Sequence, residues 1–381
     1  MLSLRILGSL CLVCVVACNA ATSMVDMQNT PNPDAAAATV GKCDALGTVG
    51  TWAKISPSGV GNTQALTLDP FNVGTVWLGA SSISKVGAGG VYKSTDCGAT
   101  FTHVNTGNNG TMVDNAAIWS MAVDYIDPGV LYVVGAYGSL GVWKSTNDGV
   151  DWTQLIPPKS EAANILAGGF IASVVMDPTD HLHLVVAPHG GCAAPYDPIC
   201  VGETFDGGGT WRFAHLPGDG WAEQAGPYII SGGTWVYSTL FAGTWSTTDS
   251  GANWKLLSTV GGSSGGEFAH RPLARHTDGN YYLPGFNHNG LLQSTDGIAW
   301  TFTPIDEISY TLGFAIGDGN FYVGDGNGAN YKVAAASDLT KWSNYPPAPA
   351  MHGSSYLEYD EAHHILYSSN FEGGLWRIVT R

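Results

Sequence analysis

The 381-residue sequence predicts an all-β fold made of about seven repeats of a four-stranded unit, and three observations support this prediction. A short turn motif recurs six times, at spacings of 42 to 59 residues. Pairs of apolar strands precede most copies of the motif. The composition suits short strands joined by tight turns, since the chain has 51 glycines, 11% aromatic residues and 12% charged residues. Repeats of this length that each supply a small sheet are typical of a β-propeller.

The motif has the form Ser/Thr-x-Asp-x-Gly-x-Thr-Trp/Phe in its complete copies. The hydroxyl and the carboxylate can accept hydrogen bonds from the backbone of a tight hairpin, and the glycine can adopt a positive φ. The terminal aromatic ring can pack within the sheet. We therefore expect the motif aspartates to build turns rather than to act as catalytic acids or metal ligands. Complete copies lie at 91–101, 142–152, 204–211 and 247–254, and shortened copies lie at 294–300 and 336–342.

A second repeated element is an apolar strand that ends in an Asp turn and leads into another strand. It occurs at 66–79, 121–134 and 174–186. Together with the strands that flank the motif, it gives each unit four strands, a to d, with the motif on the hairpin between c and d.

The last unit is incomplete. Segments 356–360, 365–367 and 374–379 supply three strands without a motif, whereas the unmatched segment 50–55 has the pattern of an outermost strand. We predict that this N-terminal strand pairs with the last unit and closes the ring, because closure removes exposed strand edges. The prediction is a seven-bladed β-propeller of four-stranded blades. Six blades is the alternative if one weak unit is misread.

The N-terminus has the features of an export signal. Residues 1–17 carry one charge, Arg5, before an apolar run that is too short to span a membrane. The run ends in Val-Val-Ala-Cys18, which resembles the bacterial lipobox and implies lipidation of Cys18. The alternative is an ordinary secretory signal that is cleaved near Ala20 or Ala21.

Residues 18–41 are rich in Ala, Thr, Asn, Asp and Pro, which predicts a flexible tether. The propeller domain is then expected at 42–381. The location implied is the cell envelope, either anchored by lipid at the outer membrane or cell surface, or secreted.

Four cysteines fall in the propeller domain, an even number that suits an oxidising compartment. Cys192 and Cys200 flank a short loop and are predicted to pair, which leaves Cys43 to pair with Cys97. No Cys-x-x-Cys pair or histidine spacing supports a metal site, so no metal or other cofactor is predicted.

The net charge of −16 disfavours nucleic acid and anionic lipid as partners, so we expect contact with a membrane only through the lipid anchor. We expect a monomer.

The turn motif resembles the Asp box (BNR repeat) of sialidases, xyloglucanases and sortilin-like receptors, over most of residues 47–381. Propellers of that superfamily include glycoside hydrolases, polysaccharide lyases, lectins, receptors and assembly factors. The resemblance therefore implies the propeller fold and a polysaccharide or oligosaccharide as the partner. A typical sialidase is disfavoured, because its three convergent arginines are hard to assemble from this chain and its Arg-Ile-Pro motif is missing. The arginines after the signal are Arg212, Arg271, Arg275, Arg377 and Arg381.

Two other relatives in the superfamily also fit poorly. Xyloglucanases of this type use two tandem propellers, whereas this chain has repeats for one. The lipid-anchored photosystem assembly factor of this fold carries a basic patch, whereas this chain is acidic.

The two faces of the predicted ring differ in character. The turns that join a to b and c to d share one face with the motif, called here the far face. The loops that join d to a and b to c share the opposite, near face and are long and varied, and the resemblance implies that the functional site lies there. The histidine pairs at 181/183 and 363/364 are instead expected to be surface residues of strand turns.

We predict that the site residues come from the near-face loops. Candidate catalytic residues are Glu223, Glu267, His270 and His352. Candidate substrate-binding residues are Arg271, Trp221, His189, His288, Tyr137 and Glu372. Trp119 is expected to pack at a blade root.

Two functions follow as hypotheses. In a glycoside hydrolase, Glu223 and Glu267 would be the carboxylate pair. In a polysaccharide lyase, a histidine would take the C5 proton and Arg271 would neutralise the uronate. The alternative is a non-catalytic propeller that binds glycan or protein, since no recognised catalytic signature is present.

Overall fold

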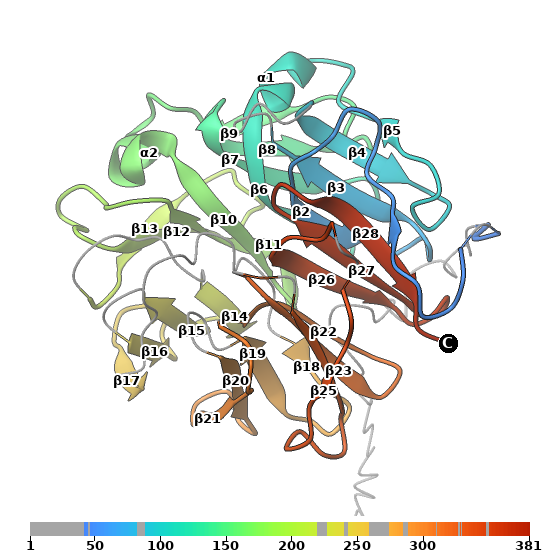
Figure 1. The fold of residues 1–381 in the computed structure, drawn as a ribbon. Coiled ribbons are helices and arrows are strands. Elements are labelled where there is room, and N and C mark those ends of the chain that lie inside the picture. Colours follow the sequence, from blue (N-terminus) through green and yellow to red (C-terminus); the bar gives the residue numbers. More distant parts are fainter. Residues whose placement is uncertain are drawn as a thin grey trace, which may run out of the picture.

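Seven four-stranded antiparallel sheets form the fold of the described residues, and Figure 1 shows them arranged in a circle. The computed structural model describes residues 42–44, 46–81, 88–218, 227–239, 243–258, 274–284, 289–309, 311–326, 328, 330–347 and 350–381. Each sheet is a blade whose first strand lies innermost, so the chain is a seven-bladed β-propeller and the six-bladed alternative is wrong.

Six blades are continuous in sequence. Blade 1 contains β2 (Thr63–Leu68), β3 (Val76–Ala80), β4 (Gly90–Ser94) and β5 (Thr102–His103). Blade 2 contains β6 (Ala116–Val123), β7 (Leu131–Gly138), β8 (Gly141–Ser145) and β9 (Thr153–Ile156). Blade 3 contains β10 (Ile171–Asp177), β11 (Asp180–Pro188), β12 (Cys200–Thr204) and β13 (Arg212–His215). Blade 4 contains β14 (Pro227–Ser231), β15 (Thr234–Thr239), β16 (Gly243–Thr247) and β17 (Lys255–Ser258). Blade 5 contains β18 (Ala274–Arg275), β19 (Tyr281–Pro284), β20 (Gly290–Ser294) and β21 (Thr301–Pro304). Blade 6 contains β22 (Thr311–Gly317), β23 (Asn320–Asp325), β24 (Tyr331–Ala335) and β25 (Ser343–Asn344).

Blade 7 joins the two ends of the propeller domain, as the sequence predicts. Its strands are β26 (Ser354–Asp360), β27 (Ile365–Asn370), β28 (Gly374–Val379) and β1 (Ala53–Lys54). β1 pairs antiparallel with β28, with Ala53 opposite Arg377. In Figure 1 the blue strands of blade 1 therefore lie beside the red strands of blade 7.

The motif turns are held by the hydrogen bonds that their residue types predict. In the copy that begins at Thr204, the threonine hydroxyl donates to Asp206 at 2.7 Å and accepts from the N–H of Gly208 at 3.0 Å. The backbone N–H of Thr210 and its hydroxyl both donate to Asp206, at 2.9 and 2.8 Å. The N–H of Thr210 is the main reason that the pKa of Asp206 falls to about 2. Both oxygens of the Asp206 carboxylate are therefore hydrogen-bonded within its own turn.

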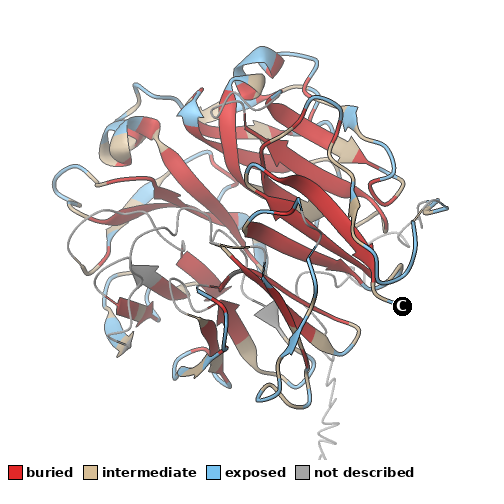
Figure 2. Ribbon diagram, in the orientation of Figure 1, coloured by how far each residue is buried: buried red, intermediate tan, exposed pale blue. Residues whose placement is uncertain are grey.

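The core lies between neighbouring blades, because each sheet is buried on both faces. Figure 2 shows burial concentrated on the strands and exposure on the loops that connect them. Blades 7 and 1 share one such cluster, in which Tyr367 and Leu375 pack with Leu66 and Leu78. Hydrogen bonds also join blades. The Tyr356 hydroxyl of blade 7, for example, donates to the backbone carbonyl of Trp119 in blade 2 at 3.1 Å.

Two disulfides confirm both predicted pairings, Cys43–Cys97 and Cys192–Cys200. The first ties the segment before β1 to the motif turn of blade 1, and the second closes the loop between β11 and β12. Disulfides of this kind are typical of proteins outside the cytoplasm. No helix among the described residues is long and apolar enough to cross a membrane.

Candidate functional site

The near face carries the longer connections of the described chain. They include α1 (Gly110–Asp114), α2 (Glu161–Ile165), the 3₁₀ turn η1 (Ala167–Gly169) and the loop closed by Cys192–Cys200. The far-face turns are short by comparison. This agrees with the expectation that the long and varied loops lie on the near face.

Four ring side chains from blades 2 and 3 meet on the near face, and they are called here the aromatic cluster: Trp119, Tyr137, Phe170 and His189. The Tyr137 hydroxyl lies 3.3 Å from Nε2 of His189. The His189 ring centroid lies 4.9 Å from that of Trp119 and 4.5 Å from that of Phe170. The cluster therefore brings together two of the predicted binding residues, Tyr137 and His189.

The members of the aromatic cluster are not equally exposed. Trp119 is 3% exposed, as expected for packing at a blade root, and His189 is 4% exposed. Tyr137 is 37% exposed and presents an aromatic surface with a hydroxyl to solvent. A rigid, partly exposed tyrosine of this kind can stack on a sugar ring while its hydroxyl makes a hydrogen bond.

Blade 7 places two further predicted residues on the same face. His352 and Glu372 are both exposed. The backbone N–H of His352 donates to Oδ1 of Asn370 at 2.9 Å, and the Asn370 amide donates to the hydroxyls of Tyr331 and Ser368, at 3.2 and 2.9 Å. The loop that carries His352 is thus fastened to the strand that leads to Glu372.

A pocket of about 260 Å³ opens on the near face of blade 6, and it is called here the blade-6 pocket. Its lining combines amides, one carboxylate, one ammonium group and ring side chains. The lining residues are Glu307, Asn330, Tyr331, Lys332, Asn344, Tyr345, Pro346 and Pro347. They come from the loop before β22, from the start of β24 and the residue before it, and from the end of β25 and the segment that follows it.

None of the predicted site residues lines the blade-6 pocket. The dipeptide Asn-Tyr lines the pocket twice, at Asn330-Tyr331 and Asn344-Tyr345, but it also occurs at Asn280-Tyr281 outside the pocket, so it is not a specific signal. Neither copy stands out without the topology that brings β24 and β25 together.

Several predicted residues lie outside the described part of the chain. They are Glu223, Glu267, His270, Arg271, Trp221, His288 and Cys18. Their roles stay predictions.

The far face contains a buried charge network that differs from the expectation for its histidines. Both ring nitrogens of His183 are hydrogen-bonded to carboxylates, with Nδ1 at 2.7 Å from Asp177 and Nε2 at 2.8 Å from Glu203. All three side chains are at most 1% exposed. Burial alone lowers the pKa of His183, but the hydrogen bonds to the two carboxylates outweigh it and raise that pKa to about 9. The expectation that His183 is a surface residue is therefore wrong, because its side chain lies between the carboxylates of Asp177 and Glu203, with Phe205 stacked on the imidazole.

Some far-face groups have the residue types of a metal site. Asp124, Asp127 and His181 lie together, as do Asp318, Glu361 and His364. In the second group the guanidinium of Arg381 lies 2.8 Å from Asp318, where a cation would have to bind. In the first, Nδ1 of His181 pairs with Asp124 at 2.9 Å. Both groups link successive blades, the first through the hydrogen bond of His181 to Asp124 and the second through the ion pair of Arg381 with Asp318.

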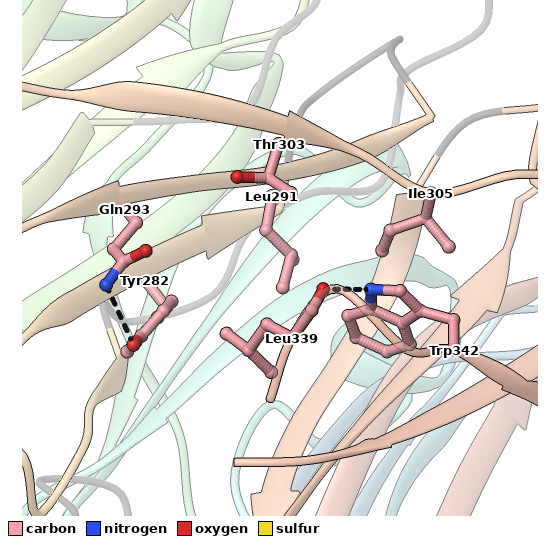
Figure 3. Close-up of a pocket in the computed structure, with 7 residues that line it drawn as sticks. All are labelled: Tyr282, Leu291, Gln293, Thr303, Ile305, Leu339 and Trp342. Atoms are coloured by element: carbon pink, nitrogen blue, oxygen red, sulfur yellow. Dashed lines mark hydrogen bonds between the residues drawn. The ribbon is translucent and has the colours of Figure 1, made fainter. Parts of the chain in front are cut away.

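A second, much smaller pocket lies between blades 5 and 6 (Figure 3). Leu291 and Ile305 of blade 5 face Leu339 and Trp342, which belong to the motif turn of blade 6. Its volume of about 10 Å³ is no more than one water occupies, so it is a gap in packing rather than a ligand site.

No protein-family model matches the sequence, and no curated protein matches it. Solved structures do resemble it. The virginiamycin B lyase of Staphylococcus aureus aligns with a TM-score of 0.60 at 10% identity, over 86% of this chain and 97% of that one. The extracellular domain of the hybrid two-component system BT3049 from B. thetaiotaomicron aligns with a TM-score of 0.60 at 12% identity, over 84% of this chain and 40% of that one.

The GH74 xyloglucanase of Xanthomonas campestris aligns with a TM-score of 0.56 at 16% identity, over 86% of this chain and 53% of that one. The present chain thus spans about half of the xyloglucanase. At these identities the likeness shows the fold alone. Fold and topology define the class of the protein as a seven-bladed β-propeller.

Proposed function

We propose that this chain is an extracytoplasmic, lipid-anchored Asp-box propeller that binds a polysaccharide across its near face and cleaves it. The observation that carries the proposal is the aromatic cluster, which holds Tyr137 half-exposed against His189 on the face with the long loops. Rigid aromatic side chains beside polar groups are the usual composition of a ligand site. The resemblance to a xyloglucanase propeller adds support for a glycan as the ligand.

The cleaving groups belong to the proposal. Glu223 and Glu267 are the first carboxylate pair for hydrolysis, and His270 or His352 is the base for a lyase reaction, with Arg271 on the uronate. Trp221, His288 and Glu372 would complete the binding surface. Cys18 would carry the lipid.

The test is incubation of the purified chain with neutral and uronic polysaccharides, followed by assays for new reducing ends and for unsaturated products. A hydrolase gives reducing ends alone, whereas a lyase gives both. Tyr137→Ala should raise KM about tenfold or more with a smaller effect on kcat, as expected for loss of a stacking contact. The control is Ile298→Ala, since Ile298 is exposed in the far-face motif turn at 294–300. No product from any polysaccharide would contradict cleavage.

A second candidate is a non-catalytic binding propeller. It is favoured by the blade-6 pocket, which offers a near-face ligand site whose lining has one carboxylate, Glu307, rather than the pair that a glycosidase of the usual kind needs at its cleavage site. In that case Tyr137→Ala weakens glycan binding and there is no turnover to lose. Turnover abolished by Glu223→Gln or Glu267→Gln would eliminate this candidate.

A further inference from the structure

The blade-6 pocket has features of a built binding site. Its wall is braced from blade 7 by Trp52, whose indole N–H donates to the carbonyl of Pro346 at 3.0 Å. The Trp52 ring packs against Tyr331 and Tyr345, with centroids 5.4 and 6.2 Å apart. The backbone N–H of Tyr345 donates to the backbone carbonyl of Tyr331 at 2.7 Å. The apolar side of the pocket is therefore held in place by contacts from a second blade.

The polar side of the pocket carries a compensated charge pair. Nζ of Lys332 lies 2.5 Å from Oε2 of Glu307, and this ammonium group lowers the pKa of Glu307. The Lys332 side chain is 7% exposed, whereas that of Glu307 is 71% exposed. The charge that faces solvent at the mouth is thus the carboxylate, and the cation beneath it is already paired.

The backbone of Glu307 supports this arrangement. Glu307 adopts a left-handed conformation with φ of 62°, which is uncommon for a residue with a side chain. The Asn330 side chain reaches the Glu307 carbonyl at 3.5 Å. The loop is thereby shaped so that the carboxylate lies over Lys332.

These features determine which chemistry the pocket recognises. The exposed carboxylate of Glu307 can accept hydrogen bonds from sugar hydroxyls, and the exposed amides of Asn330 and Asn344 can both donate and accept them. The Tyr345–Pro346 wall can contact the C–H face of a sugar ring. An anionic sugar would meet Glu307 first and would find Lys332 occupied, so its carboxylate would enter without a free counter-charge. The volume of about 260 Å³ lies below the range of pockets for drug-sized ligands, which suits a single ring.

We propose that the blade-6 pocket is a subsite for one neutral sugar residue of a glycan chain. This inference rests on the proposed function, since it names the substrate class as neutral. It also adds a binding position on the side of the ring formed by blade 6, apart from the aromatic cluster of blades 2 and 3.

Isothermal titration calorimetry of the full propeller tests the proposal. The probes are neutral hexasaccharides of glucose, xylose, mannose and galactose, and a hexagalacturonate as the anionic probe. The wild-type chain should bind at least one neutral probe and should not bind hexagalacturonate. Asn344→Ala and Glu307→Gln should each weaken the neutral complex by about tenfold, the cost of one or two hydrogen bonds.

Glu307→Gln has a second expected effect. It leaves Lys332 unpaired, so the variant should gain measurable binding of hexagalacturonate, whereas Asn344→Ala should not. The matched control is Asp148→Asn on the far face, which also removes a carboxylate from a lysine, Lys93, at 2.9 Å. This control should change neither affinity. The gain of anion binding is a readout that simple loss of folding cannot produce.

Three results would overturn the proposal, and they are distinguishable. If a neutral probe binds and both pocket variants bind it equally well, the subsite is wrong while the proposed function stands. If hexagalacturonate binds the wild-type chain better than the neutral probes, the charge argument is wrong while glycan binding stands. If no probe binds at millimolar concentration, the proposed function fails together with the subsite.

Discussion

Replacement of His183 by glutamine tests whether the buried network of Asp177, His183 and Glu203 stabilises the ring as an ionised cluster. Both ring nitrogens of His183 are bonded to carboxylates, at 2.7 and 2.8 Å, and Phe205 stacks on the imidazole at a centroid distance of 4.4 Å. The N–H of Gly232 in blade 4 also donates to Asp177, at 2.6 Å. Removal of the imidazole leaves Asp177 as an anion whose remaining partners are neutral, which typically costs about 3–5 kcal/mol in a buried pair.

The pH dependence of the free energy of unfolding gives the part of the stabilisation that comes from the protonation of His183. The pKa of His183 rises from 6.5 to about 9 in the folded chain. The stabilisation from its protonation is therefore complete below pH 6.5 and is lost as the pH rises through about 9. That shift corresponds to about 2–3 kcal/mol once screening by solvent is allowed for.

The assay is urea unfolding followed by tryptophan fluorescence, at pH values from 5.5 to 9.5. The free energy of unfolding of the wild-type chain should exceed that of His183→Gln most at low pH, and the difference should shrink by about 2–3 kcal/mol between pH 6.5 and 9. His215→Gln is the control, because His215 is exposed and should alter the free energy by less than about 0.5 kcal/mol. A difference between wild type and His183→Gln that stays constant over this pH range would refute the reasoning.

Three further predictions concern closure and turns. Replacement of Cys43 and Cys97 by serine should lower the free energy of unfolding by about 4 kcal/mol, because the disulfide closes a separation of 54 residues; an unchanged denaturation midpoint would contradict this. A chain that begins at residue 56 and carries Cys97→Ser lacks β1 and exposes the edge of β28, so it should unfold less cooperatively than the Cys43→Ser/Cys97→Ser chain and self-associate in analytical ultracentrifugation; a monomer with the melting temperature of that double variant would show that β1 is dispensable. Asp206→Ala should lower the melting temperature while leaving glycan binding intact. The difference in melting temperature should be present above pH 3.8 and disappear as the pH falls through about 2, where Asp206 becomes protonated in the folded chain. Loss of binding without loss of stability would give this aspartate a functional role instead.

The turns, the blade number and the closure of the ring could all be predicted from the sequence, and each for a local or periodic reason. Thr204, Asp206 and Gly208 bond within one turn, so their order in the chain already specifies their contacts. The number of motif copies predicts six complete blades. The unmatched strand at 50–55 is the fourth strand that the incomplete last unit lacks, so the sequence also predicts how the ring closes. The two disulfides followed from the number and spacing of four cysteines.

Only the tertiary structure decided which near-face residues meet. Tyr137 and His189 are 52 residues apart and come into contact because blades 2 and 3 lie side by side. Trp52 reaches the blade-6 pocket from the other end of the chain, because β1 closes blade 7. The burial of His183 likewise depends on Glu203 and on blade 4. Repetition in sequence determines which elements form, whereas contacts between loops depend on how the sheets are placed around the ring, and that placement comes from side-chain packing between blades.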